Sequence, residues 1–273
     1  MRLTLRTAIA AGAVTAVVAP VAGVAAGASA TTTTGRDRLH LLSAATRFHA
    51  AESNNWFGYN QGALSHSRYT SITGNWTVPT ATQHSTGQDE YSSTWIGIGG
   101  GCIDDGCGTG VTDETLIQAG TEQDVAADGT ASYNAWWEII PEPETAVSLP
   151  VHPGDQIHVA IAESTPGLWS IEIDNVSTGQ NFSTTTPYPG LGGSAEWIEE
   201  TPLLLGTNAG FGALPNLTPV QFSGATVNGA NAGLDSSQEM DLVDNSGTVY
   251  AAPSAPNATR DGFTACTWTA TCQ

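Results

Sequence analysis

From residue 53 onward the chain alternates apolar and polar residues in short runs that Gly, Pro, Ser and Thr separate. A two-residue period places successive side chains on opposite faces, which is typical of β-strands. The clearest runs predict strands over residues 91–98, 115–120, 132–140, 156–162 and 169–175. Weaker runs predict strands over residues 69–78, 195–199, 220–227, 240–243 and 248–251. Ten or more strands over roughly 220 residues indicate a single all-β domain, a sandwich of antiparallel sheets.

One segment departs from this pattern. Apolar residues at positions 41, 44, 45 and 48 follow the spacing of a helix face, so the sequence predicts a helix over residues 38–48. Residues 31–52 are also the only basic part beyond residue 30, with a formal charge of +1 against −22 for residues 53–273. We expect residues 31–52 to be a prosegment that charge attraction holds on the acidic body and that low pH releases. A linker without this role is the alternative.

The first thirty residues have the pattern of a secretory signal peptide. Arg2 and Arg6 precede an apolar run over residues 8–24, and an A-x-A motif ends at Ala30. We therefore expect residues 1–30 to be removed and the protein to be secreted, with no membrane contact afterwards. A retained membrane anchor is the alternative, although small residues dominate the run.

Charge narrows the choice of partners. The chain has no lysine, and only Arg68 and Arg260 are basic beyond residue 52, so the net charge is −19. A protein with this much negative charge would repel the phosphate backbone of DNA or RNA, so a nucleic acid is not expected as a partner. It also indicates an acidic working environment, because protonation of carboxylates relieves self-repulsion. Solubility alone is the alternative explanation.

The four cysteines form two close pairs in the sequence. In an exported chain, Cys102 with Cys107 and Cys266 with Cys272 are expected to form two local disulfides. A zinc site is the alternative, but neither pair has two-residue spacing and no histidines cluster near them.

The run over residues 131–140 combines a carboxylate with tryptophan. Strand alternation places Asn134, Trp136 and Glu138 on one face and bulky residues on the other. Such a strand lies between two layers or forms the wall of a groove. A carboxyl group among aromatic side chains can have a raised pKa and act in acid–base chemistry. The alternative is a glutamate on a solvated sheet face.

Other candidate chemistry is limited to carboxylates and amides. The chain has no G-x-S-x-G motif, no histidine in the context of a catalytic triad and no glycine loop for phosphate. Gln118 lies in an otherwise apolar run, where its amide needs partners; a satisfied core glutamine is the alternative. Glu138 and Glu196 could form a glycosidase pair. Alternatively, Glu196 as a base and Gln118 as an oxyanion donor could hydrolyse an amide.

Six motifs favour the second chemistry. They are Asn55-Trp-Phe-Gly58, Trp95-Ile-Gly-Ile-Gly-Gly100, Ile117-Gln-Ala-Gly120, Tyr133-Asn-Ala-Trp-Trp-Glu138, Ser177-Thr-Gly-Gln180 and Ala195-Glu-Trp-Ile198. In this order they resemble the glutamic peptidases, or eqolisins, which are acid endopeptidases of the scytalidoglutamic peptidase type. The resemblance covers residues 53 to about 230, most of the predicted mature chain.

The resemblance implies a bent, concanavalin-like sandwich of two large antiparallel sheets with the active site on its concave face. It implies Gln118 and Glu196 as the catalytic pair. It further implies a substrate-binding set, in which Trp136 and Glu138 support the site and Trp56 and Trp95 line the substrate cleft. Glu122 corresponds to an acidic residue just after the glutamine strand. We expect a monomer that acts on polypeptide substrates without a metal or an organic cofactor, with residues 53–273 as the peptidase domain. Activity should peak in acid, where Glu196 is still ionised, and fade toward neutral pH.

Three features depart from the family pattern. The turn at Gly97-Ile-Gly-Gly100 lacks the family's aspartate, and Asn134 replaces another aspartate. An insert lies between Cys102 and Glu114. These differences affect specificity more than the catalytic pair. A glycoside hydrolase, or a carbohydrate-binding sandwich that uses the tryptophans, remains the alternative function.

Overall fold

The computed structural model describes residues 38–40, 52–206 and 209–273. The predicted signal peptide at residues 1–30 and the apolar helix positions 41–48 lie outside the described residues. Within the described ranges, the regular structure is β-strand apart from two short 3-10 helices, Asp105–Cys107 and Ser236–Gln238. Among the described residues, no helix has the length and hydrophobicity that crossing a membrane requires.

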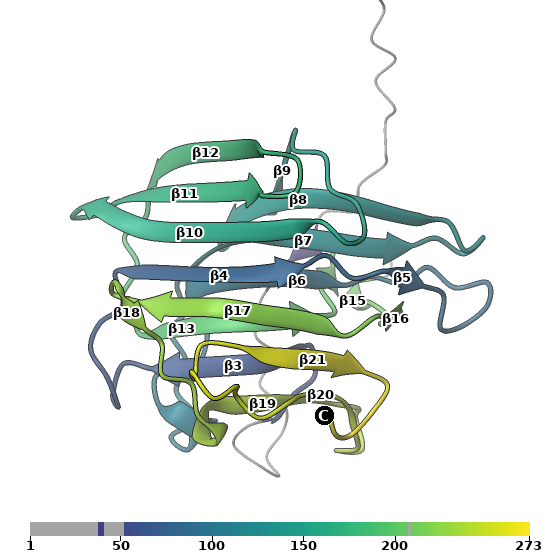
Figure 1. Ribbon diagram of the computed structural model, residues 1–273. Helices are drawn as coiled ribbons and strands as arrows, with labels where there is room; N and C mark the ends of the chain where they lie inside the picture. The colour runs from purple at the N-terminus through teal and green to yellow at the C-terminus, as the bar shows by residue number, and fades with distance from the viewer. Residues whose placement is uncertain (1–37, 41–51, 207–208) are drawn as a thin grey trace, which may run out of the picture. The chain divides into compact units, whose positions relative to one another are not determined.

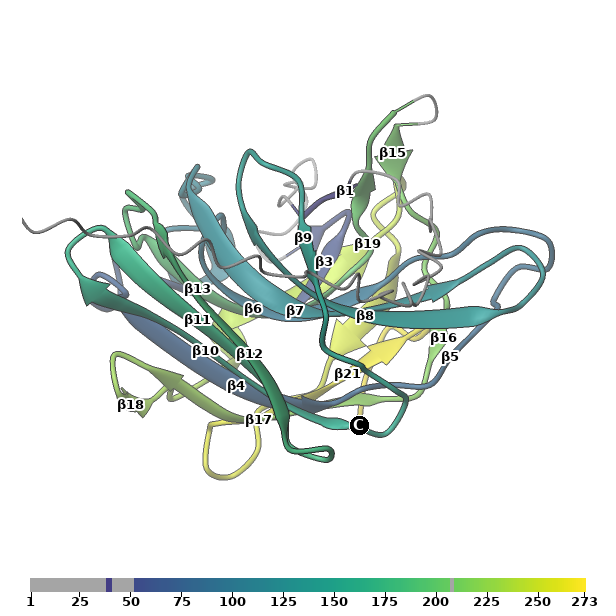
Figure 2. The same cartoon turned by 90° about the horizontal axis from the view of Figure 1, so that it is seen from above.

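Two large sheets pack face to face (Figures 1 and 2). The first sheet has the order β19-β3-β13-β6-β7-β8-β9, and the second has the order β12-β11-β10-β4-β17-β21-β20. The first contains β3 (Trp56–Gly62), β6 (Ser93–Gly99), β7 (Leu116–Val125), β8 (Ala131–Ile139), β9 (Thr145–Val147), β13 (Ser194–Glu200) and β19 (Glu239–Val243). The second contains β4 (Ser71–Thr77), β10 (Gln156–Thr165), β11 (Leu168–Asn175), β12 (Gln180–Pro187), β17 (Val220–Val227), β20 (Val249–Pro253) and β21 (Phe263–Thr267). The predicted antiparallel β-sandwich is confirmed.

Short strands complete the sheets. Strand β2 (Glu52–Ser53) pairs in parallel with β19, which in turn pairs with β20 and joins the two large sheets. The other short strands are β1 (Arg38–Leu39), β14 (Leu203–Leu204) and β15 (Gly210–Phe211) in one small sheet, β5 (Ala81–Thr82) with β16 (Asn216–Leu217), and β18 (Ala230–Asn231) on β17.

All ten predicted strands are present, and only β17 keeps both predicted ends. Strand β7 continues to Val125, five residues beyond the predicted end. Strand β12 was not predicted, because its sequence is polar apart from Phe182 and Pro187 and gives no apolar alternation. It is formed by backbone pairing with β11, an interaction that side-chain patterning does not report.

The main core lies between the two sheets. Trp76, Trp169 and Trp197 are among its largest fully buried side chains. Two indole N–H groups bridge the layers, since Trp76 Nε1 donates to Thr121 Oγ1 at 3.0 Å and Trp197 Nε1 to Thr73 O at 2.9 Å. Buried indoles usually need such a partner, so these bonds fix how the sheets are stacked.

A second apolar cluster covers the face of the first sheet that points away from the second, here called the site face. It consists of Trp56, Trp95, Leu116, Trp136, Ile198 and Met240. Because of this cluster, β3, β6 and β13 are buried on both faces along their whole length. The two-sided strand predicted over residues 131–140 lies in this same sheet as β8.

The helix predicted to begin at residue 38 is not present at residues 38–39. They form strand β1, which pairs antiparallel with β14, instead of the start of a helix. Figure 2 shows β1 on the side of the first sheet away from the second. The helix pattern is a local property, whereas pairing with β14 and contacts to the site face favour an extended backbone here.

The two predicted disulfides are present, between Cys102 and Cys107 and between Cys266 and Cys272. The first closes the insert after β6, and Cys107 packs against the apolar cluster of the site face. The insert therefore lies on the same face as the predicted catalytic residues.

Candidate active site

The predicted catalytic residues lie in one row across the first sheet. Antiparallel pairing aligns Asn60, Glu196, Gly97, Gln118 and Glu138 on the neighbouring strands β3, β13, β6, β7 and β8. Directly opposed residues of antiparallel strands point to the same face. The five positions therefore all face the site side, and two strand spacings, about 10 Å, separate the Gln118 and Glu196 backbones.

Gly97 leaves the centre of this row open. A Cβ atom there would lie 3.0 Å from Leu116 Cδ1, 3.0 Å from Trp95 Cζ3 and 3.1 Å from Gln118 Cβ. These contacts are tight, so a side chain at this position would displace its neighbours. The glycine of the Trp95–Gly100 motif thus lets Gln118 and Glu196 face each other across an unobstructed strand.

Glu196 lies under the loop that the Cys102–Cys107 disulfide closes. A Cβ on Gly101 would be 2.4 Å from Glu196 Oε1, so the loop backbone packs directly against the carboxyl group. Asn60 holds this loop by donating from Nδ2 to the carbonyl oxygen of Cys102 at 3.0 Å. The insert therefore completes the enclosure of Glu196, which is fully buried.

Burial changes the ionisation of this carboxyl group. It raises the pKa of Glu196 well above its usual value, and the charge of Asp113 adds to the rise. The Ser194 hydroxyl and the Gly101 N–H lower the pKa but do not offset burial. Burial therefore favours the neutral form of Glu196 while it is enclosed, and its ionisation as a base would require water to reach the carboxyl group.

The side-chain amide of Gln118 donates to a carboxyl group and to a backbone carbonyl of this same chain. Its Nε2 atom donates to Glu138 Oε2 at 2.5 Å and to the backbone carbonyl of His40 at 3.0 Å. Burial raises the pKa of Glu138 to about 7, and Glu200 raises it while His40 lowers it. The NH2 group of Gln118 is thus fully partnered, and one of its partners is a peptide carbonyl from residues 38–40, whereas the buried Oε1 atom has no hydrogen-bond partner among the described residues.

The three predicted tryptophans lie on the site face. Trp56 and Trp95 meet edge to face, with ring centroids 4.7 Å apart, and Trp95 Nε1 donates to Glu200 Oε2 at 2.7 Å. Trp136 stacks on the His40 imidazole at 4.1 Å between centroids. All three indoles are 0 % exposed. They form the floor of the site, not an open aromatic surface.

Arg38 contacts the acidic side of the site face. Its guanidinium donates to Glu122 and Asp124 on β7 and lies over the Tyr91 ring at 5.0 Å. Burial raises the pKa of Glu122 to about 7, although Arg38 acts in the opposite direction. The predicted site residue Glu122 therefore pairs with the Arg38 guanidinium in this structure. Asn134 Nδ2 also donates to the Glu122 carboxylate, at 3.0 Å.

His40 is held by carboxylates on both sides of its ring. Nδ1 lies 3.0 Å from Glu200 Oε2, and Nε2 lies 2.9 Å from Glu144 Oε2. Its backbone N–H donates to Glu138 Oε2 at 3.3 Å. Burial lowers the pKa of His40, but the charges of Glu200, Glu144 and Glu138 outweigh it and raise the pKa well above its usual value. The ring is therefore an imidazolium that donates from both nitrogens.

Sequence reasoning missed four of these residues: Asn60, Glu144, Glu200 and, as a site residue, His40. A signal existed for Glu200, because it alternates in phase with Glu196 along β13. Glu144 follows β8 in a loop, where no period reveals orientation. His40 comes from a segment whose local pattern predicted a helix.

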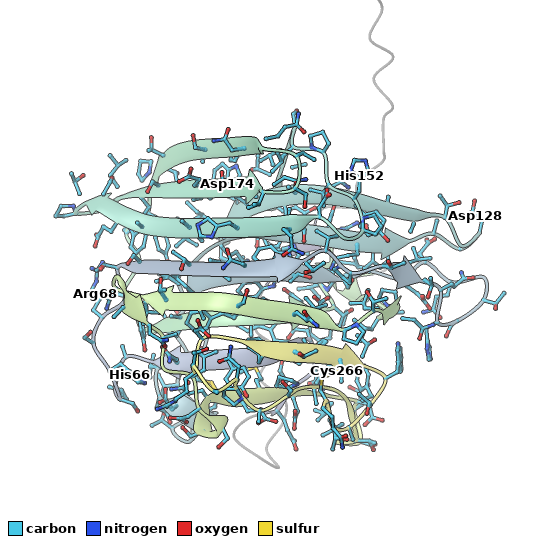
Figure 3. The ribbon with its side chains drawn as sticks, in the orientation of Figure 1. His66, Arg68, Asp128, His152, Asp174 and Cys266 are labelled. Carbon is cyan, nitrogen blue, oxygen red and sulfur yellow. A yellow bond between two sulfur atoms is a disulfide. The ribbon has the colours of Figure 1, made fainter. Side chains whose placement is uncertain are left out.

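Of the other described histidines, His158 lies on β10 and His66, His84 and His152 lie in loops. Figure 3 shows His66 and His152 toward opposite edges of the strand framework, and their side chains are 35 % and 71 % exposed. Within residues 38–40, 52–206 and 209–273, no group of three or more His, Cys, Asp or Glu side chains could hold a metal ion. The expected absence of a metal stays a prediction.

Comparison with known proteins adds independent evidence. The model of the Peptidase A4 family matches residues 54–264. Aspergillopepsin-2 from Aspergillus niger is 29% identical over 170 residues, which cover 54% of this chain and 56% of that protein. The chain thus spans about half the length of this curated relative.

Two solved structures are similar in fold. Scytalido-glutamic peptidase with a transition state analog inhibitor has a TM-score of 0.61 at 20% identity, over 78% of this chain and 98% of that chain. Aspergilloglutamic peptidase from Aspergillus niger has a TM-score of 0.53 at 26% identity, over 65% of this chain and 99% of that chain. At 20% identity the first likeness concerns the fold alone.

Proposed function

The chain belongs to the peptidase A4 family, and on that premise we propose that it is a glutamic endopeptidase that cleaves polypeptides with Gln118 and Glu196. We further propose that it is exported and works in acid outside the cell. Two local disulfides and the acidic composition support this setting. We expect it to act as a monomer.

In the proposed mechanism Glu196 is the general base. It takes a proton from a water molecule while the water oxygen attacks the peptide carbonyl carbon. The Gln118 amide N–H donates to the oxyanion that forms on the carbonyl oxygen. Glu196 then passes the proton to the leaving nitrogen as the C–N bond breaks, and two peptide products result.

One observation carries this proposal. The Gln118 amide donates to a backbone carbonyl at 3.0 Å, in the same cross-strand row as the buried Glu196. A peptide group is therefore held where an oxyanion donor is required. Gly97 lies between the two functional side chains and adds no bulk to the row.

The pKa values set expected limits on the active pH range. A general base must be ionised, so the rate should fall on the acid side of the profile where Glu196 becomes protonated. On the other side, Glu138 ionises near its pKa of about 7 and places a charge beside Gln118. We therefore expect a bell-shaped profile that ends near neutral pH.

The geometry is less favourable to the alternative functions. Glu138 and Glu196 are separated by three strand spacings, roughly 14 Å between backbones, with Gln118 between them. Glycosidase carboxyl pairs lie about 5–9.5 Å apart. A sugar-binding surface needs open aromatic rings, whereas Trp56 and Trp95 are fully buried.

The proposal predicts a particular inhibitor profile. The purified protein should hydrolyse casein at about pH 4 and leave a panel of polysaccharides intact. Chelators, sulfonyl fluorides and thiol reagents should not change the rate, because the mechanism uses no metal, serine or cysteine. Loss of activity with a chelator would point to a metal enzyme, and release of sugar without proteolysis would point to a glycosidase.

We also propose that residues 31–52 are an inhibitory prosegment. In its described part, residues 38–40, Arg38 binds Glu122 and Asp124, and the His40 carbonyl occupies the Gln118 amide. A substrate carbonyl cannot bind Gln118 in the same place. The acidic partners give the attraction that acid should weaken as they protonate.

Processing should therefore depend on pH. Incubation at about pH 4 or below should release the segment, because Glu144, whose pKa His40 and Arg38 lower, also becomes neutral there. N-terminal sequencing before and after incubation is expected to show loss of residues up to about Ser53, with a parallel gain in activity. A protein that is fully active while it still begins near Thr31, and whose activity does not change when residues 31–52 are deleted, would argue against a prosegment.

A further inference from the structure

The imidazole of His40 occupies a pocket formed by Trp136, Glu138, Glu144 and Glu200, here called the His40 pocket. We propose that this pocket is the primary specificity pocket of the peptidase and that it selects a protonated histidine as the residue on the carbonyl side of the cleaved bond. The proposal rests on the function proposed above. It names the class of substrate that this site prefers.

The backbone contacts of His40 identify the subsite. Its carbonyl accepts from Gln118 Nε2 at 3.0 Å, and its own N–H donates to Glu138 Oε2 at 3.3 Å. If Gln118 is the oxyanion donor, the carbonyl that it binds belongs to the residue before the cleaved bond. The side chain of that residue is the one that enters the His40 pocket.

The shape and charge of the pocket fit an imidazolium. The ring lies parallel to Trp136, with an interplanar angle of 8° and centroids 4.1 Å apart. Its two nitrogens face carboxylates at opposite ends, Glu200 at 3.0 Å and Glu144 at 2.9 Å. A phenyl ring could stack but would leave both carboxylates unpaired, and a lysine ammonium has no plane to stack. Arginine is planar and rich in donors, so it is the closest competitor.

The charges around the ring come from three elements. Glu138 lies on β8, Glu144 in the loop after β8, and Glu200 on β13. Asp124 on β7 adds a weaker attraction, and Arg38 is the nearby opposing cation. Burial raises the pKa of Glu144, but the hydrogen bond to His40 and the charges of His40 and Arg38 lower it overall. The pocket therefore keeps negative charge in mild acid, where histidine is protonated.

This balance gives the preference a pH dependence. A histidine in a free peptide has a pKa of about 6.5, so it enters the pocket already charged below that pH. Above it, binding must draw a proton from solvent, and the advantage of histidine declines with each further unit of pH. Residues that do not titrate have no such dependence.

The test compares peptides that differ only at one residue. The acid-activated protein is given quenched fluorescent peptides Arg-Leu-X-Leu-Leu, with X as His, Gln, Phe or Arg, and kcat/KM is measured from about pH 4 to pH 7.5. We expect His to exceed Gln and Phe by about tenfold or more near pH 5, since two charge-assisted hydrogen bonds form only with His. The ratio should shrink toward neutral pH, and mass spectrometry should place the cut after X.

A matched pair of variants tests the pocket itself. Glu144→Gln should lower the His-to-Phe ratio of kcat/KM by about tenfold, because one carboxylate partner loses its charge. Glu142→Gln, an exposed carboxylate two residues earlier in the same loop, should leave the ratio unchanged. Equal cleavage of the His and Phe peptides, or a Glu144→Gln ratio equal to wild type, would overturn the specificity proposal. Failure to cleave any peptide or casein would instead overturn the proposed function.

Discussion

Glu196→Gln and Gln118→Ala should each reduce peptide hydrolysis by at least about a hundredfold while leaving the fold intact. Glutamine at position 196 has nearly the same shape as glutamate but cannot take a proton from water. Loss of a single oxyanion donor typically costs about 10²–10³ in kcat. Because Gln118 and Glu196 act on the same carbonyl group, we expect the double variant to be little worse than either single one.

The measurement is kcat/KM on a fluorogenic peptide, with circular dichroism to verify the fold. Glu172→Gln on β11 is the matched control, since it removes an exposed carboxylate from the second sheet and should retain full activity. Near-normal turnover by a correctly folded Glu196→Gln or Gln118→Ala protein would refute the catalytic pair.

The second large effect concerns stability. The protein should be most stable in acid and should lose several kcal/mol of unfolding free energy between about pH 5 and pH 8. Burial raises the pKa of Glu199 to about 8 and that of Glu138 to about 7, against about 4.5 for an ordinary glutamate. A raised folded-state pKa gives stability that is complete below the unfolded pKa and is lost as the pH rises through the folded one.

Glu199 allows this effect to be isolated. It points into the sandwich interior, away from the catalytic row, where Thr94 Oγ1 donates to it at 2.5 Å. A shift of this size corresponds to roughly 3–5 kcal/mol. Glu199→Gln has no charge at any pH and should therefore remove that part of the loss between pH 5 and pH 8.

Denaturant unfolding of wild type and Glu199→Gln at several pH values measures the difference. Glu172→Gln again serves as the control, because an exposed carboxylate should leave the pH dependence as it is. If Glu199→Gln loses as much stability as wild type between pH 5 and pH 8, Glu199 is not a buried neutral carboxyl group.

Local sequence patterns predicted some parts of the site and could not predict others. The two-residue period of β8 correctly placed Trp136 and Glu138 on one face, because that period follows from strand geometry alone. The alignment of Gln118, Gly97 and Glu196 depends on the register of three strands. Register is set by contacts between distant residues, so here it was supplied only by resemblance to a family.

For residues 38–40, the charge predicted the observed contact correctly, whereas the local apolar spacing predicted the wrong secondary structure. Their charge led us to expect attachment to the acidic body, and Arg38 does bind Glu122 and Asp124. Their apolar spacing predicted a helix, yet Arg38 and Leu39 are extended against β14. Intrinsic helix preference is weak, and tertiary contacts such as these routinely outweigh it.

The position of the proposed catalytic pair on β7 and β13, on either side of β6, has a consequence for protein engineering. The spacing between Gln118 and Glu196 is set by backbone hydrogen bonds through β6, and loop conformation does not enter into it. The loops at the strand ends, including the Cys102–Cys107 insert, can therefore be exchanged or randomised while the reacting groups keep their separation. The first sheet would serve as a rigid scaffold. Sequence changes intended to alter substrate preference should be made in the loops around it.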